Sequence, residues 1–174
     1  MIKQHYDIFT RILHWVMAIV IIYATIAGYA MHLVIDDYPD IFHFLSVVNM
    51  SLATIAMPIF IVRWLWKHIR ETPDFPQVTH HKAAHLVHSL LYILMFSVFV
   101  SGFLMLKESY TWFWLFQIGN PITSFEINEF FFLIHRFSCM ALGTLVTLHA
   151  TAALHHHWVK GNDVLYRMVG HRKK

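Results

Sequence analysis

Four apolar stretches constrain the fold of this 174-residue chain more than any other feature of its sequence. They run over residues 12–31, 41–66, 83–106 and 130–154. Each stretch reaches the length of about 20 residues that a helix needs to cross the hydrocarbon core of a bilayer. Lipid offers the backbone no hydrogen-bond partner, so the spans must be helices. The sequence therefore predicts an all-α membrane protein, a bundle of four transmembrane helices that forms a single membrane domain over residues 1–174.

Composition agrees with a membrane domain and excludes several other classes. Hydrophobic residues make up 57% of the chain and charged residues only 13%. The single cysteine, Cys139, excludes an internal disulfide and a cysteine-based zinc or iron–sulfur site. The basic residues flank the apolar stretches, which fits membrane orientation and not nucleic-acid binding. The first stretch is too long for the core of a signal peptide, so we expect it to be retained.

Lysine and arginine set the expected orientation in the membrane. Of these 13 residues, 11 fall near the two termini or around the link between the second and third stretches. Only Lys107 and Arg136 lie on the opposite side. By the positive-inside rule, this pattern predicts that both termini lie in the cytoplasm. The outer loops carry carboxylates instead, at Asp36, Asp37, Asp40, Glu108, Glu126 and Glu129.

A tryptophan-rich segment, residues 110–116, lies among the outer acidic residues and is too short to span the membrane. Indole rings prefer the boundary between membrane and water. We therefore expect this segment to lie at the outer surface. The sequence Gly-Asn-Pro at residues 119–121 predicts a turn before the fourth helix.

Histidine is unusually frequent, with 15 in the chain, and the spacing of two of them indicates a shared helix face. His135 and His149 are 14 residues apart in the fourth stretch. This is close to four helical turns, so both imidazoles leave the same face, separated by ~21 Å along the axis. The hydrocarbon core is ~30 Å thick. Each histidine is therefore placed to hold a separate haem, one near each membrane surface.

The predicted orientation gives partners to these two histidines. His14 begins the first helix on the cytoplasmic side, at the depth of His149, and His43 begins the second helix on the outer side, at the depth of His135. Each pair supplies two axial ligands to one haem iron. Such ligation leaves no open coordination position and favours electron transfer. A single histidine at a helix end often only extends to the interface, and His43 is nearest to a loop.

Other residues near the predicted cytoplasmic surface have several possible roles. His85 and His88 share a face of the third helix. They are candidates for contact with haem propionates or a quinone head group, for a ligand that displaces His14, or for a plain interfacial role. Arg63 is a candidate propionate partner, or it serves membrane orientation alone. The run at residues 155–157 is not expected to hold one ion, because consecutive helical residues point about 100° apart.

Several short motifs along the chain are familiar as a set. They are Ile-Leu-His-Trp at 12–15, His43, Val-Arg at 62–63, the run from 84 to 92, His135, Leu-His-Ala at 148–150, Ala-Ala-Leu-His-His at 152–156 and Leu-Tyr-Arg-Met at 165–168. With these motifs the chain resembles the bacterial cytochrome b561 family of di-haem inner-membrane proteins over nearly its whole length. The family's ligand assignment, carried over, falls on His14 with His149 and on His43 with His135, in agreement with the depths.

The resemblance implies two haem b groups and respiratory electron transport with ubiquinone as the electron partner. Some members of the family are superoxide oxidases, which pass an electron from periplasmic superoxide to ubiquinone. This chain departs from them in its acidic outer loops and in the sequence Lys-Gly-Asn-Asp at 160–163, where the family usually has Lys-Asp. Two alternatives remain. One is a cytochrome b subunit that relays electrons for a partner dehydrogenase, and the other is a histidine-rich metal transporter. A homodimer is compatible with the sequence.

Overall fold

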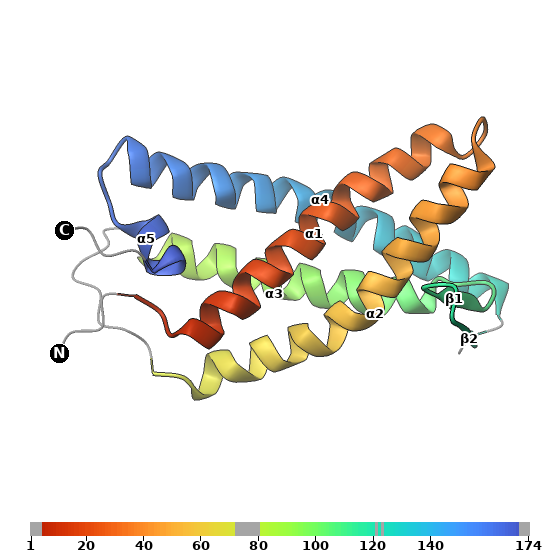
Figure 1. Ribbon diagram of the computed structural model, residues 1–174, viewed down its shortest axis with the longest axis horizontal. Coiled ribbons are helices and arrows are strands. Elements are labelled where there is room, and N and C mark those ends of the chain that lie inside the picture. Colours follow the sequence, from red (N-terminus) through yellow and green to blue (C-terminus); the bar gives the residue numbers. More distant parts are fainter. Residues whose placement is uncertain (1–4, 72–80, 121, 123, 171–174) are drawn as a thin grey trace.

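A computed structural model describes residues 5–71, 81–120, 122 and 124–170, and four long helices dominate it (Figure 1). All four helices are long and apolar enough to cross a membrane. This confirms the predicted all-α bundle and makes the chain a multi-pass membrane protein. The helices are α1 (Ile8–Val34), α2 (Pro39–Ile69), α3 (His81–Leu104) and α4 (Phe125–Trp158), and a short α5 (Val164–Val169) follows them.

Three of the four helices extend past the predicted apolar stretches at both ends. The N-terminus of α1 is an example, because the Asp7 carboxylate caps it by accepting hydrogen bonds from the Thr10 amide at 2.8 Å and the Thr10 hydroxyl at 2.6 Å. Hydropathy marks only the part of a helix that lipid requires, whereas capping groups outside the lipid decide where the helix begins. The helix α3 stops at Leu104, two residues short of the prediction.

The early end of α3 has a polar cause. Asn128 is fully buried at the start of α4, and its side-chain amide donates to the carbonyls of Leu104 at 2.8 Å and Leu106 at 2.7 Å. The last carbonyls of a helix have no partner within the helix, so this amide satisfies groups that would otherwise be orphaned. The expected turn at residues 119–121 ends on Pro121, which lies outside the described residues.

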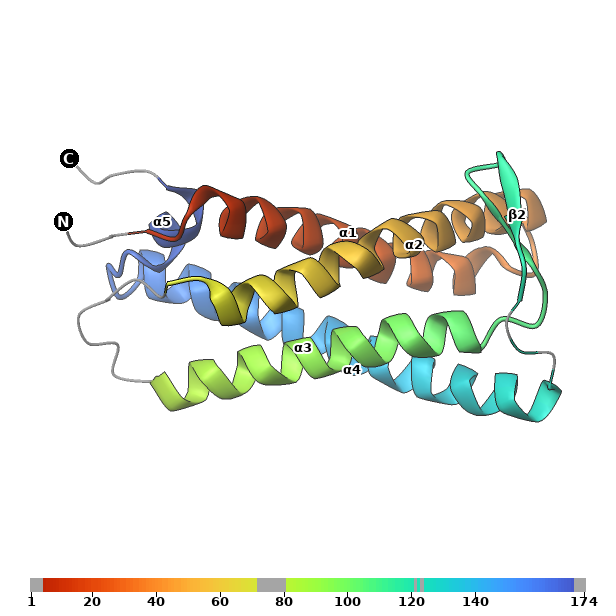
Figure 2. The ribbon, with the colours of Figure 1, turned by 90° about the horizontal axis from the view of Figure 1, so that it is seen from below.

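The helices form two layers, with α1 lying along α2 and α3 lying along α4 (Figure 2). The layers meet in the middle of the bundle, where the buried side chains are Met17, Ala56, Phe60, Met95, Phe99 and Leu142. Many large apolar side chains on the outside of the bundle are exposed, as a surface in contact with lipid requires. The two ends of the bundle carry different charges. We name the end where α1 begins and α4 ends the basic end, and the opposite end the acidic end.

The tryptophan-rich segment forms an antiparallel hairpin of β1 (Tyr110–Trp112) and β2 (Phe116–Ile118) at the acidic end (Figure 2). The sequence did not predict these strands. Phe113 and Trp114 in the turn have φ angles of 41° and 61°, a conformation that large side chains rarely adopt. Contacts with α2 hold the turn, because the Phe113 amide donates to the Ser51 hydroxyl at 2.8 Å and Trp114 stacks on Phe44.

The helix α5 folds back onto the start of α1 at the basic end. The Trp15 indole donates to the Met168 carbonyl at 3.2 Å, and the Arg11 guanidinium donates to the Val169 carbonyl at 3.1 Å. The Tyr6 amide donates to the Arg167 carbonyl at 3.2 Å. Residues 5 and 170 therefore lie at the same end of the bundle (Figure 1).

Candidate functional site

A cluster at the basic end receives one residue from each long helix. His14 comes from α1, Arg63 from α2, His88 from α3 and His149 from α4. The His88 and His149 rings lie 5.3 Å apart between centroids, with an interplanar angle of 66°. His14 lies within electrostatic range of Arg63, His149 and His88. The structure therefore gathers His14 and His149, the predicted pair, and adds His88 as a third imidazole.

Arg63 joins three helices at the cluster through two hydrogen-bond contacts. Its Nη2 lies 3.0 Å from His14 Nδ1, and its Nε donates to the Tyr92 hydroxyl at 3.2 Å. The ammonium group of Lys67 also lies over the Tyr92 ring, 4.7 Å from the ring centroid. A guanidinium can only donate hydrogen bonds. In this arrangement His14 Nδ1 is therefore an acceptor, and the ring proton of His14 is on Nε2.

His85 does not join the basic-end cluster in the same way. His85 and His88 lie three residues apart on α3, and both are exposed. His85 acts on His88 electrostatically, whereas only His88 makes a ring contact with His149. Of the two, His88 is the residue positioned beside a predicted haem ligand.

His135 occupies a close-fitting seat against α3 near the acidic end. Its Nδ1 lies 3.1 Å from the Val98 carbonyl oxygen and 3.2 Å from the Ser101 hydroxyl oxygen. Its Nε2 lies 3.4 Å from the sulfur of Cys139, which is one turn further along α4. Gly102 is buried beneath the ring, and a Cβ at this position would lie 3.1 Å from His135 Cε1. A side chain at position 102 would therefore press against the His135 ring.

His43, the predicted partner of His135, lies on α2 with an exposed side chain. Within the described part of the chain, no hydrogen bond or ring contact joins His43 to His135. The two ligands of one haem lie on opposite faces of the macrocycle, so they need not touch each other. The pairing of His43 with His135 stays a prediction, whereas His14 and His149 lie in one cluster.

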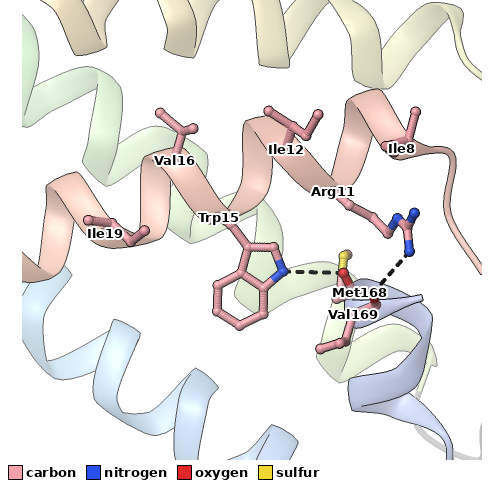
Figure 3. A pocket seen from close by; sticks show the side chains of 8 residues that line it. All are labelled: Ile8, Arg11, Ile12, Trp15, Val16, Ile19, Met168 and Val169. Atoms are coloured by element: carbon pink, nitrogen blue, oxygen red, sulfur yellow. Dashed lines mark hydrogen bonds between the residues drawn. The ribbon is translucent and has the colours of Figure 1, made fainter. Parts of the chain in front are cut away.

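A shallow groove of about 510 Å³ runs along the outer face of α1 next to the basic-end cluster (Figure 3). Trp15 forms part of its wall, and the Trp15 ring lies 5.5 Å from the His14 ring between centroids. Arg11 contributes a buried Nε that has no hydrogen-bond partner among the described residues. The groove is lined by Ile8, Arg11, Ile12, Trp15, Val16, Ile19, Met168 and Val169.

Sequence reasoning missed Ser101, Val98 and Tyr92, which contact the predicted site residues. A signal for Ser101 was present, because a polar residue inside a span is costly and usually faces the bundle interior. The last residue of the histidine run at 155–157 contacts the chain that follows α4. His157 Nδ1 lies 3.1 Å from the Asn162 carbonyl, and the His157 ring packs on Tyr166. Among the described residues, no three His, Cys, Asp or Glu side chains form a group suited to one metal ion.

Comparison with known proteins gives consistent matches. Residues 5–171 match the family described as prokaryotic cytochrome b561. Cytochrome b561 homolog 2 of Escherichia coli (strain K12) is 25% identical over 184 residues, covering 96% of this chain and 92% of that protein. Cytochrome b561 homolog 1 of the same organism is 32% identical over 117 residues, covering 64% of this chain and 66% of that protein.

Proposed function

Since the chain belongs to the prokaryotic cytochrome b561 family, we propose that it is a di-haem b cytochrome that carries electrons between its acidic face and ubiquinone. Family membership implies binding of b-type haem and electron transfer. The observation that carries the proposal is the position of His135 and His149 on one helix. They lie ~21 Å apart along α4, and each has its own polar surroundings at one end of the bundle.

The residues at both ends fit a haem. At the acidic end, Gly102 leaves room for the His135 ring, and a Cβ would fill that space. The groups bonded to His135 Nδ1 leave the lone pair on Nε2. In the structure that lone pair faces the Cys139 thiol at 3.4 Å, so coordination of a metal would require the thiol to turn away. At the basic end, His14 and His149 are the proposed ligands. Arg63 and Lys67 lie beside them as cations for propionates. Bound haem supplies one-electron chemistry between ferric and ferrous iron.

Arg63 has a specific part in this arrangement. A neutral imidazole that gives Nε2 to iron keeps its proton on Nδ1. That proton would face the donating guanidinium, 3.0 Å away in the structure. Ligation through Nε2 of His14 therefore requires Arg63 to turn away from His14 Nδ1. The Arg63 guanidinium is then available to a carboxylate, which supports its role as a propionate partner.

The groove beside Trp15 supports a quinone as the electron partner. Its apolar lining suits an isoprenoid chain, and Arg11 offers a donor at the membrane boundary. Trp15 lies in contact with His14, so a head group in the groove is close to the basic-end cluster. We place this end in the cytoplasm of a bacterium and the protein in its inner membrane, because the basic residues gather there.

Superoxide oxidation is the leading activity in the proposal. Two superoxide anions release two dioxygen molecules and two electrons, and ubiquinone takes these electrons with two protons to form ubiquinol. Arg136 is exposed beside His135 and offers a local positive charge. Stopped-flow loss of superoxide with ubiquinone as acceptor tests the activity. The rate should fall as salt rises, because screening weakens attraction of the anion to Arg136.

One observation favours the relay subunit as a second candidate. Lys107 forms a salt bridge with Glu129 at 2.6 Å. Its positive charge is therefore largely neutralised and does little to attract superoxide past the outer carboxylates. An acidic face instead complements a basic redox partner. Absence of any superoxide reaction at both low and high salt, together with co-purification of a second redox subunit, would favour this candidate.

The first experiment is an optical spectrum of the purified protein with its haem-to-protein ratio. We expect a dithionite-reduced α band typical of haem b and a ratio of two haems per chain. A ratio of one rejects the di-haem proposal while keeping the family assignment. If the purified protein contains no haem but carries a bound transition metal, the metal transporter is favoured.

A further inference from the structure

We infer that Ser101 is a positioning residue that acts with the Val98 carbonyl to fix the tautomer of His135 and so tunes the electron affinity of the acidic-end haem. The inference rests on the proposed function, in which His135 is a haem ligand. It concerns residues of α3 that would not touch iron.

The hydrogen bonds decide which ring nitrogen carries the proton. The Val98 carbonyl, 3.1 Å from His135 Nδ1, can only accept a hydrogen bond. The Ser101 hydroxyl already donates to the Ser97 carbonyl at 2.5 Å, so its lone pair faces Nδ1 at 3.2 Å. Two acceptors therefore surround Nδ1, which must carry the proton. The lone pair of His135 is left on Nε2.

Packing holds the ring in this orientation. Ser101 is 1% exposed, so water does not compete for the bond. Gly102 lies under the ring, and a Cβ there would approach His135 Cε1 to 3.1 Å. His135 Nε2 points along α4 toward Cys139, away from its bonds to α3. The seat thus determines both the tautomer and the direction of the coordinating nitrogen.

The chemical consequence follows from ligand basicity. Acceptors on Nδ1–H draw the proton away from the ring and make Nε2 a stronger donor to iron. A stronger donor stabilises ferric iron more than ferrous iron, which lowers the reduction potential. At the basic end, no corresponding pair of acceptors is seen at His14 Nδ1 among the described residues, where Arg63 is the neighbour instead. The two sites therefore differ in the groups that surround the ligand's Nδ1.

The test compares Ser101→Ala with Ser97→Ala in the haem-loaded protein. Ser97 lies one turn earlier on α3 and bonds the Ser138 hydroxyl instead of His135, so it is a matched loss of a hydroxyl. We expect Ser101→Ala to raise the potential of one haem by about 28 mV or more. This corresponds to a threefold change in the reduction equilibrium, since tenfold is 59 mV for one electron. Electron paramagnetic resonance should show changed g values for the same haem.

Three outcomes overturn the inference. If the potentials and g values of Ser101→Ala equal those of the parent protein, the Ser101 hydroxyl does not act on His135. Equal shifts in Ser97→Ala indicate a general packing effect. If Ser101→Ala loses a haem, Ser101→Thr, which keeps the hydroxyl, must restore it, and failure to do so rejects the inference. His135→Ala separates the two proposals, because retention of both haems in that variant removes His135 as a ligand, whatever Ser101 does.

Discussion

Arg63 donates a hydrogen bond to Nδ1 of His14 across 3.0 Å, joining α2 to α1 at the basic end of the bundle. The guanidinium is fixed from its other side by Tyr92 of α3. A permanent positive charge is therefore held within contact of the residues proposed to ligate the basic-end haem.

Replacement of Arg63 by Gln should lower the potential of the basic-end haem. Reduction adds an electron to the haem, and loss of a nearby positive charge makes that step less favourable. A redox titration followed by optical spectroscopy measures the effect, which we expect to be tens of millivolts. Arg63→Lys is the matched control, because it keeps the positive charge at this position. A shift in Arg63→Lys as large as that in Arg63→Gln would contradict a role for the charge of Arg63.

Single replacements of the four proposed ligands should sort into two groups. His14→Ala and His149→Ala should each remove the basic-end haem, and His43→Ala and His135→Ala should each remove the other. Haem content and potentials of the remaining haem measure this. His32→Ala is the control, because His32 lies exposed at the end of α1.

His88 decides between two versions of the basic-end site. Its ring faces His149 at 5.3 Å, yet we expect His88→Ala to keep both haems, since His14 is the proposed second ligand. Loss of a haem in His88→Ala with retention of both in His14→Ala would make His88 the ligand in place of His14.

Gly170→Ala should loosen α5 from α1. Gly170 has a φ of 82°, and a Cβ there would overlap the Arg11 guanidinium that holds the Val169 carbonyl. Gly161→Ala is the control, because Gly161 has a φ of 64° with open space around it. Both changes should cost about 1 kcal/mol through backbone strain, and Gly170→Ala should cost more. Thermal unfolding in detergent, with proteolysis of the C-terminal tail, measures the difference.

Asp7 makes the stability of α1 dependent on acid. Burial by itself raises the pKa of the Asp7 carboxyl, but hydrogen bonds from Thr10 and the charge of Arg70 outweigh it, so the pKa lies below its usual range. Stability from the ionised cap is thus present at neutral pH and lost as pH falls through this lowered pKa. Asp7→Ala should cost about 1 kcal/mol at pH 7. The gap between the melting temperatures of variant and parent should narrow at pH 3.

The sequence alone determined the four spanning helices and the depth of each histidine along them. Hydropathy and helical rise act along one dimension, so the positions of His135 and His149 on α4 follow from residue numbers. The helix ends did not follow, because polar groups such as Asp7 and Asn128 set them through contacts outside the apolar pattern. The hairpin of residues 110–118 was also not predicted from the sequence, since its strained turn at Phe113 depends on a contact with Ser51 of α2.

Only the tertiary structure decided which residues meet between the helices. Lipid tails are as apolar as the interior of the bundle, so hydrophobicity carries no signal for the sides on which spans pack. Polar contacts and small residues decide this instead. They bring His88 to His149, set Arg63 against His14, and place His135 over Gly102 with its proton toward Val98 and Ser101. The sequence thus supplied the candidate ligands, and packing supplied their neighbours.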